Sequence, residues 1–456
     1  MPSVRFGTDG IRGIAGESLS DSVAFALGAA LAERFPDGTM LIGRDTRPSG
    51  AGLSAALAAG VNAFGANAVD LGVIPTPGLA SVVFGEPTAS CGVVVTASHN
   101  PVEYNGLKVL GRDGRKIDDA VERELEAAIE RVLARGGAGG SVGRPGSDPA
   151  PVGAAYRDRY VSHLAAVASK TSPRASASGL RVVVDAAHGA GAPFAVAALA
   201  ATGAEVEGMA LGDGVINDGV GATAPAALGA RVAAVGADLG IALDGDADRC
   251  VVVDERGVPI DGDVVIGLIA LDRKARGCAR SDEVVATVLT NSGIERQLSA
   301  AGIRMRRTAV GDRHIAAAFG AIREGFGGEK SGHLLFPEHS PTGDGLISAL
   351  EVIALRARAD GPLSERAAAL PLDPQVQREI RVQAGEAERL LADPRFIEVQ
   401  RDAEEILTAT GGRLLVRPSG TEPLLRVMAE GPVATAVASA AERLISTAAD
   451  LLGRRT

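Results

Sequence analysis

From residue 40 onward this chain alternates short aliphatic runs with alanine-rich segments, and this alternation restricts its fold more than any other feature. The aliphatic runs, which predict buried strands, are residues 40–43, 93–95, 181–185, 239–243 and 284–288. The segments with helical composition include residues 52–63, 118–133 and 342–358. Strands that alternate with helices build mainly parallel sheets covered by helices, so the sequence predicts an α/β fold.

The length of the chain predicts more than one domain, because 456 residues exceed what a single hydrophobic core organises. Residues 135–151 are rich in glycine and proline and predict a linker, and prolines 362, 371 and 374 mark a later boundary. Near the end of the chain, two strands and a helix indicate a smaller α+β domain; they are residues 413–416, 424–428 and 435–452. We therefore expect four domains, at residues 1–151, 152–253, 254–370 and 371–456.

The charge and the apolar pattern exclude several classes of protein. A net charge of −10 argues against a general nucleic-acid binder, which needs a basic face. No apolar run approaches the roughly 20 residues that span a bilayer, and residues 1–5 lack the apolar core of a signal peptide. Cys91, Cys250 and Cys278 are too widely spaced for a disulfide framework or a zinc site. The sequence thus predicts a cytoplasmic protein with neither a membrane nor a nucleic-acid partner.

Three aspartates follow the apolar run at 239–243. Asp244, Asp246 and Asp248 alternate with Gly245 and Ala247. In extended chain, alternate side chains share one face, so the three carboxylates can converge on one ion. Oxygen ligands of this kind suit Mg²⁺. An acidic surface turn is the alternative, and the position at a strand end favours the metal site.

A serine follows the run at 93–95 in the same way. Residues 96–101 read Thr-Ala-Ser-His-Asn-Pro, and Pro101 disfavours helical geometry at Asn100. We expect Ser98 on a surface loop at a strand end, where open α/β sheets place their chemistry, although a turn residue or helix cap is the alternative. No Gly-x-Ser-x-Gly sequence surrounds it, which disfavours a hydrolase triad. We therefore interpret Ser98 as a serine that carries phosphate beside the metal.

A site of this kind needs positive side chains and a place for its substrate. Three carboxylates and a phosphoserine of about −2 outweigh one Mg²⁺, so cations must complete the site. Arg12, Lys108 and Arg249 are the candidates. Glycines, hydroxyls and charged groups suited to a phosphorylated sugar gather in three further segments, residues 6–13, 327–333 and 417–423, the last with Arg426 nearby. Taken alone, each segment is also compatible with an ordinary polar turn or loop.

The serine segment 96–101, the aspartate segment 244–249 and the three segments just described occur in an order that resembles the α-D-phosphohexomutase superfamily. The resemblance covers nearly the whole chain and is closest to the glucosamine-specific group of that superfamily. The resemblance implies three similar mixed α/β domains and a smaller C-terminal α+β domain around a central active-site cleft. It implies that Ser98 is the phosphoserine, and that Asp244, Asp246 and Asp248 bind Mg²⁺ together with the serine phosphate. Further residues that the resemblance places in catalysis are Lys108 and His333, as general acid or base, and Arg12 and Arg249, at the phosphoserine. The residues that it places at the substrate are Gly311, Asp312, Glu329, Ser331, Arg417, Ser419, Gly420, Thr421 and Arg426.

The reaction implied by the resemblance converts glucosamine 6-phosphate to glucosamine 1-phosphate, for UDP-N-acetylglucosamine synthesis. It implies one Mg²⁺ per subunit and glucosamine 1,6-bisphosphate as intermediate and activator. It allows a homodimer, and the first phosphate on Ser98 would come either from autophosphorylation or from a kinase. Residues 329–331 (Glu-Lys-Ser) favour glucosamine over the glucose and mannose enzymes, which stay the nearest alternative. A catalytically silent sugar-phosphate sensor and a Mg²⁺ phosphatase with an aspartate nucleophile are the alternatives from other classes.

Overall fold

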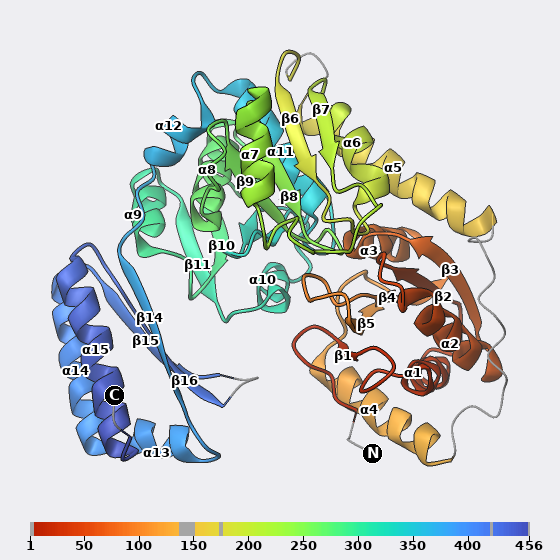
Figure 1. Ribbon diagram of the computed structural model, residues 1–456, viewed down its shortest axis with the longest axis horizontal. Helices are drawn as coiled ribbons and strands as arrows, with labels where there is room; N and C mark the ends of the chain where they lie inside the picture. Colours follow the sequence, from red (N-terminus) through yellow and green to blue (C-terminus); the bar gives the residue numbers. More distant parts are fainter. Residues whose placement is uncertain (1–3, 136–150, 173–176, 420–422, 455–456) are drawn as a thin grey trace. The chain divides into compact units, whose positions relative to one another are not determined.

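The structure is a computed structural model that describes residues 4–135, 151–172, 177–419 and 423–454. The chain divides into two compact units (Figure 1). One unit consists of Met1–Val288 and Met305–Ala368, and the other of Leu289–Arg304 and Ala369–Thr456. The linker predicted at 135–151 lies almost entirely outside the described residues. Among the helices described, none combines the length and the apolar character that crossing a bilayer requires.

The first sheet of the larger unit has the strand order β1-β5-β4-β2-β3. Its strands are β1 (Ile11–Ile14), β2 (Thr39–Arg44), β3 (Asn67–Val73), β4 (Ala89–Val95) and β5 (Tyr104–Gly111). β2 runs parallel to β3 and β4, whereas β5 runs antiparallel to β4. Every residue of β4 is buried, which explains why the sequence there is continuously small or aliphatic instead of alternating. The helices that follow these strands are α1 (Asp21–Arg34), α2 (Gly50–Ala63), α3 (Thr76–Gly85) and α4 (Asp119–Ala134).

Two further sheets have the strand order that the first sheet shows when it is read from its other edge, β3-β2-β4-β5, without the added strand β1. Each of these three sheets, with its helices, is called a repeat below. The second sheet is β7-β6-β8-β9 and the third is β11-β10-β12-β13, each ending in an antiparallel pair. The strands of the second are β6 (Arg181–Asp185), β7 (Glu205–Met209), β8 (Leu239–Leu243) and β9 (Cys250–Asp254). Those of the third are β10 (Glu283–Thr287), β11 (Arg304–Thr308), β12 (Gly327–Gly328) and β13 (Leu334–Leu335). The loops predicted to carry chemistry therefore occupy equivalent places, between β4 and β5, β8 and β9, and β12 and β13.

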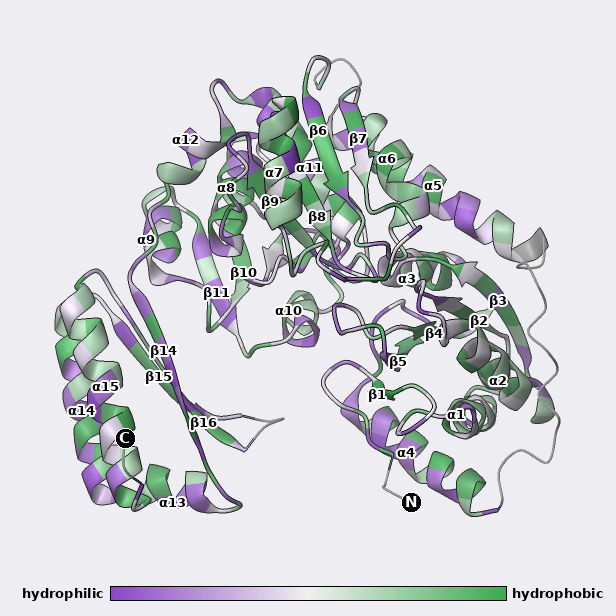
Figure 2. Ribbon diagram, in the orientation of Figure 1, coloured by the Kyte–Doolittle hydropathy of each residue, from purple (hydrophilic) through white to green (hydrophobic). Residues whose placement is uncertain are grey.

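Aspartate side chains cap the starts of several helices in the larger unit. The helix expected at 342–358 is α11 (Gly345–Arg358), because Asp344 accepts hydrogen bonds from the amides of Leu346 and Ile347 and caps it. Asp118 caps α4 in the same way. Hydrophilic and hydrophobic residues alternate along α4, as Figure 2 shows. The remaining helices of this unit are α5 (Pro151–Thr171), α6 (Ala192–Ala200), α7 (Ala226–Val235), α8 (Gly262–Ala275), α10 (Asp312–Phe319) and α12 (Leu363–Ala368).

The smaller unit contains the antiparallel sheet β14-β16-β15, formed by β14 (Gln375–Arg381), β15 (Arg413–Pro418) and β16 (Leu424–Glu430). Helices α13 (Glu386–Ala392), α14 (Pro394–Ala409) and α15 (Ala434–Leu451) belong to it, and Phe396, Leu425 and Leu444 lie in its core. The α+β character predicted for the end of the chain is confirmed. Helix α9 (Ser292–Ala300) also belongs to this unit, since the amide of Ser292 donates to Oε1 of Glu430 at 3.0 Å.

Candidate active site

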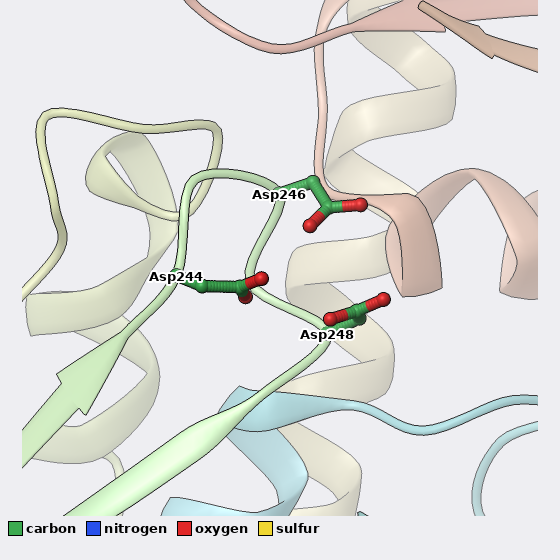
Figure 3. A group of neighbouring side chains, drawn as sticks. All are labelled: Asp244, Asp246 and Asp248. Atoms are coloured by element: carbon green, nitrogen blue, oxygen red, sulfur yellow. The ribbon is translucent and has the colours of Figure 1, made fainter. Parts of the chain in front are cut away.

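The loop between β8 and β9 brings three carboxylates together (Figure 3). Asp244, Asp246 and Asp248 are buried, and one oxygen from each lies within 4.8 Å of the others. The backbone can turn this tightly because Ala247 has a left-handed φ of 55°. Oδ1 of Asp246 and Oδ1 of Asp248 are buried without a hydrogen-bond partner among the described residues. Two buried carboxylate oxygens without a hydrogen-bond partner, in a cluster that offers only oxygen donors, fit a hard divalent ion.

Ser98 lies directly against this triad. Its hydroxyl donates to Oδ2 of Asp244 at 2.6 Å, and its amide donates to Oγ1 of Thr96 at 2.9 Å. Its backbone has a left-handed φ of 52°, an uncommon conformation for a residue with a side chain. The expectation of a surface loop is wrong, because Ser98 is only 1% exposed. The loop is enclosed by the second repeat, from which the aspartates come.

Lys108, on β5, supplies the main positive charge at the triad. Its ammonium lies 2.7 Å from Oδ2 of Asp246, 2.9 Å from Oδ2 of Asp9 and 3.5 Å from Oδ2 of Asp248. Burial alone would lower the pKa of Lys108, but these carboxylates outweigh it and raise the pKa well above its usual value. Lys108 is therefore a protonated ion-pair partner in this state.

His333 lies at the end of the loop between β12 and β13. Its Nδ1 is 3.7 Å from Oδ1 of Asp248, and its Nε2 is 3.6 Å from Oδ2 of Asp312. Burial favours the neutral ring, yet the two carboxylates raise the pKa of His333 to about 9. The structure thus places a second protonated group beside the triad. His333 lies between two strands of the third sheet, whereas Lys108 lies on a strand of the first.

Asp9 and Lys116 extend the network, although the sequence did not predict a role for either. The ammonium of Lys116 lies 2.5 Å from Oδ1 of Asp9 and 2.8 Å from Oδ2 of Asp312. Arg12 also pairs with Asp9. Burial raises the pKa of Asp9, but Lys108, Lys116 and Arg12 hold it well below its ordinary value. Only the position of Asp9 within the glycine-rich segment 6–13 signalled its place in the site.

Another contact absent from the sequence analysis comes from the N-terminus of α3. The hydroxyl of Thr76 donates to Oδ2 of Asp246 at 2.6 Å, and its amide donates to the carbonyl of Asp246 at 3.1 Å. Thr76 therefore fixes both the backbone and the carboxylate of the central aspartate. No sequence pattern pointed to this residue, because the contact joins two different repeats.

Arg12 and Arg249 keep donors available at the site. The amide of Arg249 donates to Oδ1 of Asp244 at 3.2 Å, and its Nε lies 3.8 Å from Oδ1 of Asp248. Nε of Arg12 and Nε of Arg249 are buried without a hydrogen-bond partner among the described residues. Burial lowers the pKa of Arg249, but Asp248, Asp244 and Asp246 raise it above its ordinary value, so it stays charged. Both guanidinium groups are thus prepared to bind an anion.

The segment predicted to read the sugar is ordered by Glu329. Its Oε1 accepts the amide of Gly311 at 2.9 Å, and its own amide donates to the carbonyl of His333 at 3.0 Å. Asp312, next along the chain, is paired with Lys116 and His333 as described above. Ser331 is exposed on the same loop. Four of the predicted residues, Gly311, Asp312, Glu329 and His333, therefore belong to one connected network.

The predicted phosphate-binding residues lie in the smaller unit, which is considered by itself. Arg417 on β15 stands opposite Arg426 on β16, and both line a cavity of about 510 Å³ with Gln377 and Met428. Burial and the nearby charge of Arg426 lower the pKa of Arg417. Oγ of Ser419 is buried without a hydrogen-bond partner among the described residues. Gly420 and Thr421 lie outside the described residues.

Four family profiles match the chain in sequence. They are described as phosphoglucomutase/phosphomannomutase α/β/α domains I, II and III and the C-terminal domain, at residues 3–135, 158–257, 261–372 and 379–446. Among solved structures, a phosphoglucomutase/phosphomannomutase family protein from Burkholderia thailandensis has a TM-score of 0.79 at 26% identity and covers 99% of this chain and 98% of its own. The N-acetylphosphoglucosamine mutase of Aspergillus fumigatus, solved with GlcNAc-6P and magnesium, has a TM-score of 0.63 at 19% identity, covers 98% and 95% of the two chains and shares the fold.

Two curated relatives are similar over most of their length. The phosphoglucosamine mutase of Xanthobacter autotrophicus is 43% identical over 438 residues, which cover 93% of this chain and 94% of that protein. The phosphoglucosamine mutase of Symbiobacterium thermophilum is 44% identical over 448 residues, with 94% and 95% covered. The predicted fold is confirmed by the four matching domains. The chain belongs to the phosphoglucosamine mutase family, within the α-D-phosphohexomutase superfamily.

Proposed function

We propose that this protein interconverts glucosamine 6-phosphate and glucosamine 1-phosphate through a phosphorylated Ser98. The observation that carries the proposal is the contact of 2.6 Å between the Ser98 hydroxyl and a carboxylate of the buried triad. Relatives at 42–44% identity that are named phosphoglucosamine mutase support the choice of sugar.

The donor set of the triad supports Mg²⁺ as the cofactor. Asp244, Asp246 and Asp248 offer carboxylate oxygens only, and two of these oxygens have no hydrogen-bond partner among the described residues. A Mg²⁺ held by them, with an oxygen of the Ser98 phosphate, would neutralise negative charge on the transferring phosphoryl group. The alternative of an acidic surface turn is not supported, since all three side chains are buried.

In the first half-reaction, a hydroxyl oxygen of the sugar attacks the phosphorus on Ser98. The new phosphorus–oxygen bond forms as the bond to Oγ breaks, the sugar hydroxyl gives up its proton, and Oγ takes one up. The second half-reaction reverses these changes with the other phosphate of glucosamine 1,6-bisphosphate. Lys108 and His333 carry protons beside the triad and exchange them with the reacting oxygens, while Arg12 and Arg249 bind phosphoryl oxygens.

The remaining predicted residues bind the sugar and the phosphate that is not transferred. Glu329 has one carboxylate oxygen fixed by Gly311, which leaves the other for a sugar hydroxyl. Ser331 lies on the same loop as Glu329, and Asp312 follows Gly311 in the chain. Arg417, Ser419 and Arg426, with Gly420 and Thr421, bind the second phosphate; the paired arginines and the free hydroxyl of Ser419 support this. Binding either phosphate at one site is what an end-for-end turn of the bisphosphate requires.

Glucosamine 1,6-bisphosphate also acts as activator in this proposal, because it can return a phosphate to an empty Ser98. The very first phosphate would come from autophosphorylation or from a kinase, and a homodimer is the proposed assembly. Intact-protein mass before and after incubation with each candidate donor distinguishes the sources, and light scattering of the purified chain tests the dimer.

The deciding experiment combines peptide mass spectrometry with turnover on glucosamine, glucose and mannose 6-phosphates. We expect one phosphate on Ser98, its removal by monophosphosugar, and the highest kcat/KM on glucosamine 6-phosphate. A preference for mannose or glucose would overturn the sugar. Phosphate release that Asp244→Asn abolishes and Ser98→Ala does not would establish the phosphatase instead, and binding of phosphosugar without turnover would establish the sensor.

A further inference from the structure

Arg47, a buried residue that the proposed chemistry does not use, holds the loop that carries Ser98. It lies between β2 and α2, and its side chain is 0% exposed. Its guanidinium donates to the carbonyl of Ser98 at 2.9 Å, of Asn100 at 2.7 Å and of Tyr104 at 2.8 Å, and also to that of Pro101. One side chain thus bonds three carbonyls of the loop between β4 and β5 and that of the first residue of β5.

The orientation of Arg47 is itself fixed. Its Nε donates to Oδ2 of Asp45 at 3.0 Å, and Oδ2 of Asp45 also accepts the hydroxyl of Thr96 at 2.6 Å. Thr96 in turn accepts the amide of Ser98. The polar groups on both sides of the Ser98 backbone, its N–H and its C=O, are therefore tied to the same buried ion pair of Asp45 and Arg47.

Asn217 holds the same loop from the second repeat. It lies between β7 and α7, and its amide nitrogen donates to the carbonyl of Ser98 at 2.9 Å and to that of Asn100 at 3.2 Å. The aspartate loop closes against the same atom, since a Cβ on Gly245 would lie 2.6 Å from the carbonyl oxygen of Ser98. The carbonyl of Ser98 is thus enclosed by Arg47, Asn217 and the backbone that carries the triad.

We propose that Arg47 and Asn217, together the Ser98 clamp, are positioning residues for phosphoryl transfer. By bonding the same two carbonyls from two different repeats, they hold Ser98 in its left-handed conformation with Oγ directed at Asp244. A serine that loses these contacts relaxes toward a commoner backbone conformation and turns its hydroxyl away from the triad. The inference deepens the proposed function and rests on it in one respect, namely that Ser98 carries the transferred phosphate.

The two test variants remove the clamp in different ways. Asn217→Gly accepts the left-handed φ of 61° at this position but donates neither hydrogen bond. Because Asn217 is only partly buried, this variant is expected to fold. Arg47→Lys keeps a positive charge beside Asp45 but lacks the planar fork that reaches four carbonyls.

Matched controls separate positioning from general loss of stability. Asn67→Gly removes an asparagine whose amide donates to Oγ1 of Thr39 at 3.3 Å, away from the site. Arg273→Lys changes another buried arginine, which is 3% exposed and pairs with Glu338 at 2.6 Å. Thermal unfolding of all four variants is recorded first, and rates are measured well below the lowest unfolding temperature.

Two rates are measured on the full chain with Mg²⁺. One is the transfer of phosphate from glucosamine 1,6-bisphosphate to Ser98, followed by intact-protein mass, and the other is steady-state turnover. Because a misplacement of about 1 Å can cost about 100-fold, we expect both rates to fall about 10- to 100-fold in the clamp variants, with KM nearly unchanged. The controls should keep wild-type rates.

The outcomes distinguish the inference from the proposed function. Wild-type rates in folded Asn217→Gly, or losses in the controls as large as those in the clamp variants, overturn the clamp. The proposed sugar is overturned if the wild-type protein loads Ser98 from glucose 1,6-bisphosphate but does not turn over glucosamine phosphates. In that case the rates at which the variants load Ser98 from glucose 1,6-bisphosphate decide whether the clamp is correct. A wild-type Ser98 that takes phosphate from neither bisphosphate overturns both.

Discussion

The ammonium of Lys108 lies 2.7 Å from Oδ2 of Asp246, and the two side chains are 1% and 0% exposed. A charge this deeply buried is tolerated only because its partner is present. Replacing Lys108 by methionine would leave Asp246, Asp9 and Asp248 without their shared cation.

We expect Lys108→Met to lower the free energy of unfolding by about 3–5 kcal/mol in metal-free buffer, as for other buried pairs that lose one partner. Added Mg²⁺ should recover part of this loss, since it binds the freed carboxylates. Chemical unfolding with EDTA and with Mg²⁺ measures both effects. The matched control is Lys330→Met, because Lys330 is 42% exposed, pairs with Asp261 and should cost less than about 1 kcal/mol. Equal losses in the two variants would contradict the prediction.

Ser98→Ala should remove phosphorylation and turnover, since no other described hydroxyl is hydrogen-bonded to Asp244. Because Ser98 is buried and its hydroxyl bonds a carboxyl group, the variant should also lose about 1–3 kcal/mol of stability. Intact mass, a coupled assay and thermal unfolding check these three expectations. Ser54→Ala, at a buried serine on α2 whose hydroxyl has no hydrogen-bond partner among the described residues, should retain activity. Turnover by Ser98→Ala would disprove the phosphoserine.

Mg²⁺ should stabilise the protein through the triad. A ligand at 100 times its dissociation constant adds about 2.7 kcal/mol to folded-state stability, so the melting temperature should rise with Mg²⁺ and fall with EDTA. Asp248→Asn removes one carboxylate and should abolish most of this shift. Differential scanning fluorimetry across a Mg²⁺ titration tests it, with Asp113→Asn at an exposed turn as the control. A shift that persists unchanged in Asp248→Asn would place the ion elsewhere.

Glu329→Gln should change substrate preference more than stability. The amide keeps the hydrogen bond from Gly311 but removes the charge, so the melting temperature should stay near that of wild type. The ratio of kcat/KM between glucosamine and glucose 6-phosphates should fall. If that ratio is unaltered, Glu329 does not read the sugar.

His339 should make stability depend on pH in acid. Burial, together with Arg273 and Lys170, lowers the pKa of His339 to about 4. The unfolded chain binds the proton below about 6.5, whereas the folded chain resists it down to about 4, so stability is lost as the pH falls through this window. Urea unfolding at pH values between 4.5 and 7.5 gives the free energy of unfolding as a function of pH. This free energy should change less with pH in His339→Gln than in the wild-type protein. Identical slopes would contradict the assignment.

The sequence predicted the parts of the site that lie within one stretch of chain. The alternation of Asp244, Asp246 and Asp248 after an apolar run was sufficient to foresee their convergence, because it depends on local geometry. Ser98 was recognised for the same reason, at the end of β4. The strands were located to within a few residues wherever burial on both faces produced an aliphatic run.

Contacts between segments that lie far apart in the chain could not be foreseen. Thr76, Arg47 and Asn217 reach loops more than 50 positions away in the chain, and none has a local pattern that marks it. The burial of Ser98 was missed for this reason, since the second repeat encloses its loop. Likewise, β14 has no fully buried residue and is mostly polar, so its sequence did not stand out as a strand.

The repeated strand order has a mechanical consequence. Each of the three loops leaves its sheet on one strand and returns on the antiparallel neighbour, so ladder hydrogen bonds anchor both of its ends. Two anchored ends restrict how far such a segment moves relative to its own sheet. We therefore expect each set of reactive groups to move with the sheet that carries it and to keep its local geometry.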